Sequence, residues 1–129
     1  MSDEQPVHVM SVEECWEMLR EEEFGRLAFH LAEQVHITPI NYALDGETIL
    51  FRTAEGSKLL GVVMNPDIAF EIDRYDDDCA CSVVLRGTAR QLEEWEEHRA
   101  ENVPLRPWVP TLKYNVVEIT PTELSGRRF

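Results

Sequence analysis

The sequence predicts a mainly β protein, a small barrel of antiparallel strands capped by a few short helices. Three observations lead to this prediction. Most segments alternate apolar and polar residues, which is the pattern of a strand with one buried face. Residues that form turns separate these segments at short intervals. Only short stretches have the spacing of an amphipathic helix, and the 129 residues are the size of one domain.

A helix is predicted at the start of the domain. We expect residues 1–10 to be a flexible N-terminal segment and residues 11–129 to form a single domain. Ser11 and Glu14 have the spacing of a capping box, in which each side chain bonds the backbone N–H of the other residue. The helix should end near Glu23. Its apolar face is expected to consist of Val12, Cys15, Trp16 and Leu19.

Two strands are predicted after this helix. Residues 25–32 alternate, which places Leu27, Phe29 and Leu31 on one face. Residues 35–44 are rich in β-branched and aromatic side chains, which favour strands. Pro39 lies inside the second segment, and because a proline cannot donate to a ladder, it must sit at an edge, a bulge or a break.

A hairpin turn at Asp45 and Gly46 joins these strands to a third, because both residues tolerate positive φ. On this third strand, residues 48–54, Phe51 and Arg52 face opposite sides. The remaining elements follow from the same patterns. In chain order they are a helix at 57–64, a strand at 68–75 with Ile68, Phe70 and Ile72 inward, an acidic loop at 76–81, a strand at 82–92, a short acidic helix at 93–100, an irregular segment at 102–111 and a last strand at 113–120.

Charge and composition exclude several classes of partner. The formal net charge of -13 disfavours nucleic acid, whose binding proteins carry a basic surface, and anionic membrane surfaces as well. The first ten residues have neither a basic leader nor an apolar run, and no apolar stretch has the length of a membrane span. The three cysteines suggest no disulfide framework. We therefore expect a cytoplasmic protein.

The segment "FRTAEGSK" brings together several groups that bind phosphate. Arg52 offers a planar guanidinium, Lys58 a mobile charge, and Thr53 and Ser57 offer hydroxyls. A helix that begins at Ser57 would also point its free N–H groups at an anion. The spacing differs from that of a nucleotide-binding Walker loop. An ordinary strand-to-helix connection, with Ser57 as the cap and Arg52 paired to a surface carboxylate, explains the same residues.

Several segments resemble the pyridoxamine 5′-phosphate oxidase-like family of flavin-binding split barrels. They are "GRLAF", "TPINYALDGETILFRTAEGSKL", "AFEID", "SVVLRGTARQL", "LRPWVP" and "VVEITPTELSGRR". Together they span roughly residues 11 to 128, in the order of the family's elements. The resemblance implies a split β-barrel of the antiparallel Greek-key type that binds FMN. It also implies a homodimer with two flavin sites at the subunit interface.

The same resemblance implies roles for individual residues. The FMN phosphate would be held by Arg52, Thr53, Ser57 and Lys58. The flavin ring would lie beside Thr38, Pro39, Ile40 and Asn41. Trp108 would lie near the flavin of its own or of the partner subunit. FAD or a deazaflavin in place of FMN is an alternative within this family.

The function that follows is an FMN-dependent oxidoreductase acting on a small organic molecule, with the flavin supplying the redox chemistry. No side chain stands out as an acid or base, so no catalytic residue is assigned. A flavin carrier or sensor without turnover, a deazaflavin-dependent reductase and a dimer that has lost its ligand remain alternatives. Oxidation of pyridoxamine phosphate itself is not expected, because the chain lacks the family's extended basic substrate-binding segment.

Other candidate sites have simpler explanations. Cys79 and Cys81 could form half of a metal site, but structural zinc needs four ligands, so a pair of reduced thiols is favoured and no metal is expected. His30 and His36 flank a predicted turn and could meet across the hairpin. The acidic run "DRYDDD" lacks the ligand spacing of a calcium loop and is interpreted as a solvated surface.

Overall fold

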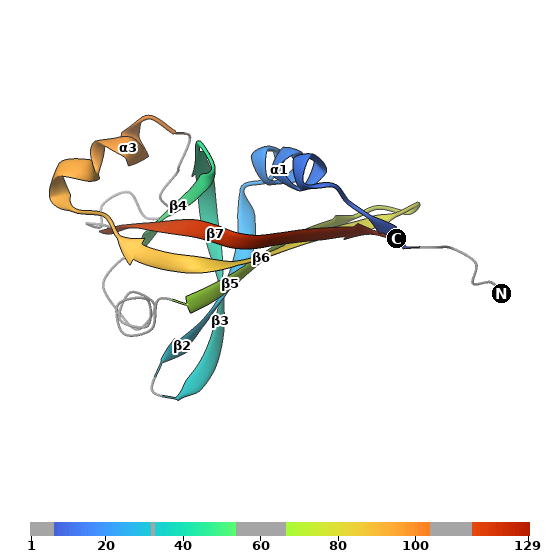
Figure 1. Cartoon of the computed structure of the whole chain (residues 1–129), viewed down its shortest axis with the longest axis horizontal. Helices are drawn as coiled ribbons and strands as arrows, with labels where there is room; N and C mark the ends of the chain where they lie inside the picture. The colour runs from blue at the N-terminus through green and yellow to red at the C-terminus, as the bar shows by residue number, and fades with distance from the viewer. Residues whose placement is uncertain (1–6, 32, 54–66, 104–114) are drawn as a thin grey trace.

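The described chain forms a closed antiparallel barrel (Figure 1). The structure, a computed structural model, describes residues 7–31, 33–53, 67–103 and 115–129. Its strands are β1 (His8–Val9), β2 (Phe24–Leu31), β3 (Gln34–Asp45), β4 (Thr48–Thr53), β5 (Asp67–Tyr75), β6 (Ala80–Gln91) and β7 (Asn115–Arg128). Their order is β1-β7-β4-β3-β2-β5-β6, and β6 also pairs with β7, which closes the ring. The prediction of a mainly β protein is confirmed.

Alternation along the strands places the core inside this ring. The inward residues predicted on the fifth strand, Ile68, Phe70 and Ile72, are all buried. Ile49 and Phe51 of β4 are fully buried in the same cluster, whereas Leu50 belongs to a second, smaller cluster on the outer side. The outer cluster packs beneath η1 (Glu94–Glu96) and α3 (His98–Glu101), two short helical segments that replace the single helix predicted at 93–100.

The first helix, α1 (Val12–Glu21), covers one end of the barrel. Its capping box is confirmed, because the Glu14 N–H donates to Ser11 Oγ at 3.1 Å and the Ser11 N–H donates to Glu14 Oε1 at 2.8 Å. Met18 is buried against the core, whereas Val12, which was expected on the apolar face, is 55% exposed. The phenolic hydroxyl of Tyr42 ties this helix to β3 by donating to the Leu19 carbonyl at 2.8 Å.

Two predicted boundaries differ from the structure. The turn residues between β3 and β4 are Gly46 and Glu47, one position later than predicted, because Asp45 already pairs with Thr48. Only Gly46 of this pair has a positive φ, of 63°. The last strand continues past residue 120 to Arg128, because a shift in register between Arg86 and Gly87 of β6 accommodates the continuing β7.

Some predicted elements fall outside the described residues. These are the helix at 57–64 and nearly all of the irregular segment at 102–111. At the N-terminus, His8 and Val9 pair with Arg128 and Arg127 of β7, so strand pairing begins before residue 11. Within the described ranges, no helix has the length and apolar character needed to cross a membrane.

Candidate functional site

Arg52 lies near the end of β4, on the outer side of the barrel. It pairs in register with Val116 of β7, and its neighbours along the strand, Phe51 and Thr53, face the interior. The side chain is half-buried, and its Nε atom is buried without a hydrogen-bond partner among the described residues. A buried guanidinium N–H that lacks a partner is costly, because burial removes its hydrogen bonds to water. This nitrogen therefore fits a site that an acceptor such as a phosphate oxygen would complete.

Thr53, the last residue of β4, is next to Arg52 but faces the other way. Its side chain is 5% exposed, and it pairs in register with Asn115. Because alternate residues of a strand point to opposite faces, one phosphate can contact both side chains only beyond the end of the strand. The chain continues from there into residues 54–66, so Ser57 and Lys58 lie outside the described residues, as does Trp108.

The predicted ring-binding segment lies on β3. Ile40 is 3% exposed in the barrel core and Thr38 is half-buried, whereas Pro39 and Asn41 lie on the outer face, which Arg52 shares. Ile40 can therefore contact an external ligand only through its backbone. Of the predicted ring-binding residues, Pro39 and Asn41 are therefore the two whose side chains share a face of the barrel with Arg52.

One edge of β3 is open along this segment. Residues 34–41 pair with β2, but the pairing with β4 begins only at Tyr42, so they have no second strand partner in the described part of the chain. The Tyr42 N–H donates to the Glu23 carbonyl at 2.9 Å, on the side of β2. Alternation then turns the backbone groups of Ile37 and Pro39 toward the open edge. Pro39 thus sits at an edge, as its missing N–H required.

The outer face of the β2–β3 hairpin exposes three large apolar side chains beside Arg26 and His30. They are Phe24, Val35 and Ile37, which are 49%, 71% and 69% exposed. Figure 1 shows this hairpin projecting from the body of the barrel. Exposed apolar patches on one face are typical of protein interfaces.

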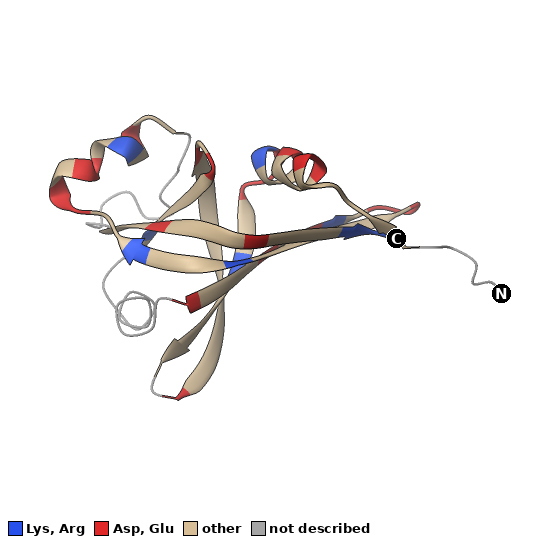
Figure 2. Ribbon diagram, viewed as in Figure 1, with Lys and Arg blue, Asp and Glu red and all other residues tan. Residues whose placement is uncertain are grey.

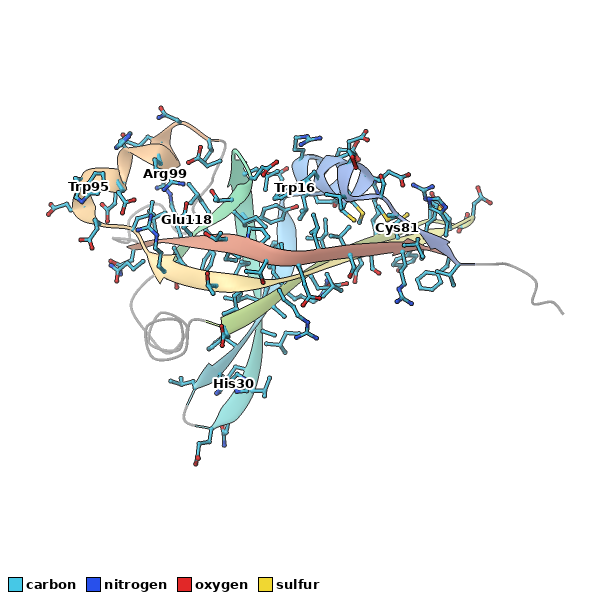
Figure 3. All side chains as sticks on the ribbon, in the orientation of Figure 1. Trp16, His30, Cys81, Trp95, Arg99 and Glu118 are labelled. Carbon is cyan, nitrogen blue, oxygen red and sulfur yellow. The ribbon has the colours of Figure 1, made fainter. Side chains whose placement is uncertain are left out.

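His30 and His36 do not meet on this hairpin. His36 faces the interior, where its ring stacks on Phe29 with a centroid separation of 5.4 Å, while His30 pairs with Val35 on the outer face. Figure 3 shows His30 on the projecting hairpin. The interpretation of these histidines as neighbours is wrong, because adjacent register positions place the two side chains on opposite sides of the hairpin.

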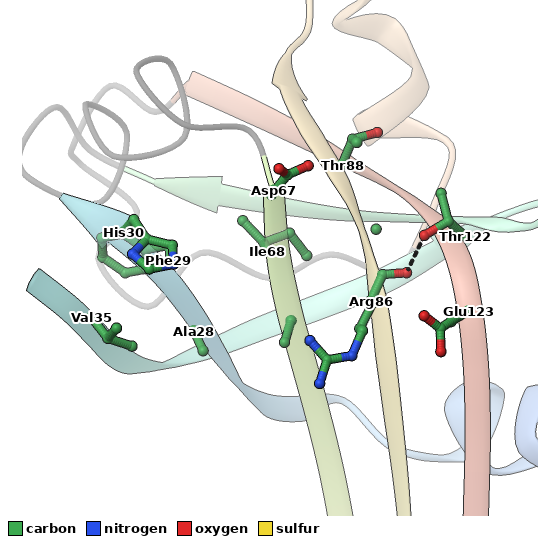
Figure 4. Close-up of a pocket in the computed structure, with 12 residues that line it drawn as sticks. Ala28, Phe29, His30, Val35, Asp67, Ile68, Arg86, Thr88, Thr122 and Glu123 are labelled. Atoms are coloured by element: carbon green, nitrogen blue, oxygen red, sulfur yellow. Dashed lines mark hydrogen bonds between the residues drawn. The ribbon is translucent and has the colours of Figure 1, made fainter. Parts of the chain in front are cut away.

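A pocket of about 540 Å³ lies on the outer side of the barrel, next to the hairpin (Figure 4). It extends across β2, β5, β6 and β7, with Val35 of β3 at its margin. Its lining combines apolar side chains with Arg86, Asp67 and Glu123, which are charged, and with polar side chains from β2, β6 and β7. Arg86 is not predictable as a site residue from its local sequence, because nothing there distinguishes it from other surface arginines.

A cluster of ion pairs holds η1 and α3 over the outer face of β4 and β7. Arg90 bonds Glu96 at 2.7 Å and Glu118 at 3.0 Å, and Arg99 bonds Glu118 at 2.5 Å and Asp45 at 2.6 Å. The Arg90 guanidinium lowers the pKa of Glu96 to about 2. Figure 3 shows Arg99 and Glu118 close together beneath α3, and Figure 2 shows the acidic side of this segment.

In the described part of the chain, the cysteines and acidic groups form no further centre. Cys15, Cys79 and Cys81 are free thiols. Asp76, in the acidic loop, accepts hydrogen bonds from the backbone N–H groups of Asp78 and Cys79, which lower its pKa. Within the described residues, no group of three or more His, Cys, Asp or Glu side chains is arranged to hold a metal ion.

Comparisons with known proteins extend these observations. The model of a family described as pyridoxamine 5′-phosphate oxidase matches residues 11–128. A conserved protein of unknown function from Corynebacterium diphtheriae is 40% identical, covers 97% of this chain and 99% of its own, and has a TM-score of 0.83. The FAD binding protein from Mycobacterium smegmatis is 36% identical, with coverage of 95% and 99% and a TM-score of 0.79.

Two further relatives agree with this picture. A structure from Corynebacterium glutamicum is 37% identical, covers 98% of this chain and 95% of its own, and has a TM-score of 0.83. An uncharacterized protein of Mycobacterium tuberculosis is 39% identical over 87 residues, which are 67% of this chain and 79% of the relative. The shared architecture confirms the predicted split-barrel fold.

Proposed function

The chain belongs to the pyridoxamine 5′-phosphate oxidase family, and on this basis we propose that it binds a flavin nucleotide and is a flavin-dependent oxidoreductase acting on a small organic molecule. The observation that carries the proposal is the buried Nε of Arg52, which has no hydrogen-bond partner among the described residues. It lies at the end of a strand and on the same outer face as the predicted ring-binding segment. A phosphate oxygen is the acceptor that this position favours.

The proposed site is built from two strands. Arg52 and Thr53 hold the phosphate at the end of β4, together with Ser57 and Lys58 in the segment that follows. Along β3, Pro39 and Asn41 face the ring from the outer side, and the backbone groups of Pro39 are directed to the open edge. Thr38 and Ile40, whose backbone groups point to β2, contact the ring only through main-chain packing. Trp108 completes the set. When bound, the flavin supplies hydride and electron transfer, and these residues bind and orient it.

The identity of the nucleotide is the finer part of the proposal. The sequence favours FMN, whose single phosphate matches the donors around Arg52. FAD is the second candidate, because a relative that is 36% identical over nearly its whole length is named as an FAD binding protein. A deazaflavin would use the same phosphate donors. Mass spectrometry of the compound released by heating the purified protein distinguishes the three.

We also propose a homodimer with the flavin at the interface, in the cytoplasm. The exposed side chains of Phe24, Val35 and Ile37 support the dimer, because they form an apolar surface beside the proposed ring site. The open edge of β3 lies next to this surface, so a second subunit there would enclose the ring. The free thiols of the three cysteines support a reducing compartment.

The direct test is a titration of flavin-free protein with FMN and with FAD, in which fluorescence quenching reports binding. We expect Arg52→Gln to raise the dissociation constant roughly 10- to 150-fold, because a charge-assisted hydrogen bond contributes about 1.5–3 kcal/mol. Arg127→Gln, at an exposed arginine on β7, is the matched control and should bind like the wild type. Equal affinity of all three proteins would show that the phosphate site is elsewhere.

Turnover separates an enzyme from a carrier. With bound flavin, the oxidation of NADH or NADPH in the presence of small electron acceptors is expected to exceed that of free flavin at the same concentration. A protein that binds flavin tightly but gives no turnover with any donor and acceptor would instead be a carrier or sensor.

A further inference from the structure

The pocket on the outer side of the barrel has a flat floor. Ala28 of β2 pairs with Ala69 of β5, and Ala69 pairs in turn with Arg86 of β6, so the three residues form one row across neighbouring strands. Their side chains point outward, because the intervening positions Leu27 and Phe70 are buried in the core. Two adjacent alanines leave the sheet without bulky cover, and the pocket of about 540 Å³ opens above them.

The size and lining of this pocket are those of a small-molecule site. Ligand pockets typically measure about 300–1,000 Å³ and combine apolar walls with a few polar groups. Here the alanine floor and Val35 supply apolar contact, and Thr88 and His30 supply polar groups at the margin. A planar ring is the shape that a flat floor of small side chains accommodates.

Arg86 is the cation of the pocket. It lies opposite Glu123 in the register of β6 and β7, yet its guanidinium forms no ion pair with any described residue. Figure 4 shows the guanidinium directed from β6 toward β5, while Glu123 lies on the other side, by β7. The arginines at 26, 74, 90 and 99 each bond a carboxylate. Arg86 thus has its donors directed over the floor of the pocket.

The remaining charges limit the ligand. Asp67 and Glu123 lie at the margin of the pocket, so a group with two negative charges, such as a phosphate, would be repelled by both. A single carboxylate close to Arg86 gains a charge-assisted contact at hydrogen-bond distance, where attraction exceeds the weaker repulsion from the margin. The charge pattern therefore favours a monoanion.

We propose that this pocket binds a small ring compound with one carboxylate, the ring lying over Ala28 and Ala69 and the carboxylate bonded to Arg86. The binding itself needs no flavin. Its role as the second reactant of a flavoenzyme rests on the proposed function, and it is supported by position, because Val35 at the pocket margin and Ile37 on the same strand face lead from the pocket to the proposed ring site.

The test is a titration of the full-length protein with benzoate, nicotinate and 4-nitrobenzoate, monitored by amide chemical shifts. Benzamide, a neutral compound of the same shape as benzoate, measures the contribution of the charge. We expect at least one carboxylate to bind, and Arg86→Gln to weaken it at least about tenfold, as the loss of a charge-assisted bond predicts. Benzamide should bind wild type about as weakly as benzoate binds this variant.

Two further variants complete the experiment. Ala69→Leu fills the floor and should abolish binding while keeping the charge, and Arg127→Gln should bind like the wild type. Unchanged affinity in Arg86→Gln, or no binding of any carboxylate to the wild type, would overturn the proposal. Flavin binding is measured on the same samples, so failure of the pocket alone and failure of the flavin site alone are distinguishable.

Discussion

The substitution Glu118→Gln tests the ion-pair cluster that holds η1 and α3 on the barrel. The Glu118 side chain is 8% exposed and accepts from Arg90 Nε at 3.0 Å and from Arg99 Nη2 at 2.5 Å. The amide keeps one acceptor oxygen and directs its NH₂ group at an arginine. One charge-assisted bond is lost, which contributes about 1.5–3 kcal/mol, and a buried donor is left facing a cation.

Two features of the cluster adjust this magnitude. Arg90 is 50% exposed, so water replaces part of its lost interaction, and both arginines keep a second carboxylate. We therefore expect Glu118→Gln to lower the free energy of unfolding by about 2 kcal/mol, below the roughly 3–5 kcal/mol of a fully buried pair. This loss of unfolding free energy is larger than that expected for a surface ion pair, because the Glu118 carboxylate is buried.

The matched control is Glu71→Gln, which breaks a pair of similar length at the surface. Glu71 bonds Arg26 at 2.9 Å, but their side chains are 29% and 48% exposed. Such pairs contribute about 0–1 kcal/mol. Urea unfolding at one protein concentration, without flavin, gives both values from the shift in midpoint at constant m. Equal losses in the two variants, or no loss in Glu118→Gln, would refute the assignment of this cluster as a clamp.

Three other substitutions or conditions follow from the structure. Hydrogen bonds from Arg90 lower the pKa of Glu96 to about 2 in the folded state. The stabilisation of the fold by the Glu96 carboxylate is therefore present above its ordinary pKa near 4.5 and is lost as the pH falls toward 2. The urea midpoint of the wild type should fall over this range, and the midpoint of Glu96→Gln should fall less steeply. Gly25→Ala would place its Cβ 2.5 Å from Phe70 Cζ, so thermal unfolding should show a loss of about 1–3 kcal/mol, and an unchanged Tm would contradict this packing. Ile37→Glu, at a side chain that is 69% exposed, should leave the far-UV circular dichroism unchanged and convert the proposed dimer to a monomer in sedimentation, whereas a variant that stays dimeric would place the interface elsewhere.

The parts of the fold that the sequence predicts well are those governed by local rules. The capping box at Ser11 and Glu14 needs residues three apart, and the buried faces of β4 and β5 need only alternation. Boundaries that depend on a partner strand were predicted less well. The pairing of Asp45 with Thr48 places the hairpin turn one residue later than predicted. The last strand, β7, continues beyond its predicted end through a register shift at Gly87 of β6. The two backbones approach closely there, since a Cβ at Gly87 would lie 2.3 Å from the Thr120 carbonyl oxygen.

The functional residues also differ in whether the local sequence is enough to predict them. Arg52 could be found from its neighbours in the chain, because a cation followed by hydroxyls and a lysine forms a local pattern. Arg86 could not, because its surroundings come from other strands: Ala28 and Ala69 are 58 and 17 positions away along the chain and are brought beside it only by the pairing of β2, β5 and β6. An alanine that lies beside an arginine only through strand pairing leaves no recognisable pattern in the sequence of either strand.

Alternation also decides what each predicted residue can do at a shared site. Arg52, Pro39 and Asn41 face the outside of the barrel, whereas Thr53, Thr38 and Ile40 face the interior. A ligand on the outer face therefore meets side chains from the first group and only backbone from Ile40. The segment after Thr53 must supply the remaining phosphate donors, so the proposed site predicts that Lys58→Ala weakens flavin binding while Thr38→Val leaves it nearly unchanged. Comparable losses in both variants would place the ring inside the barrel, against the observed burial of Ile40.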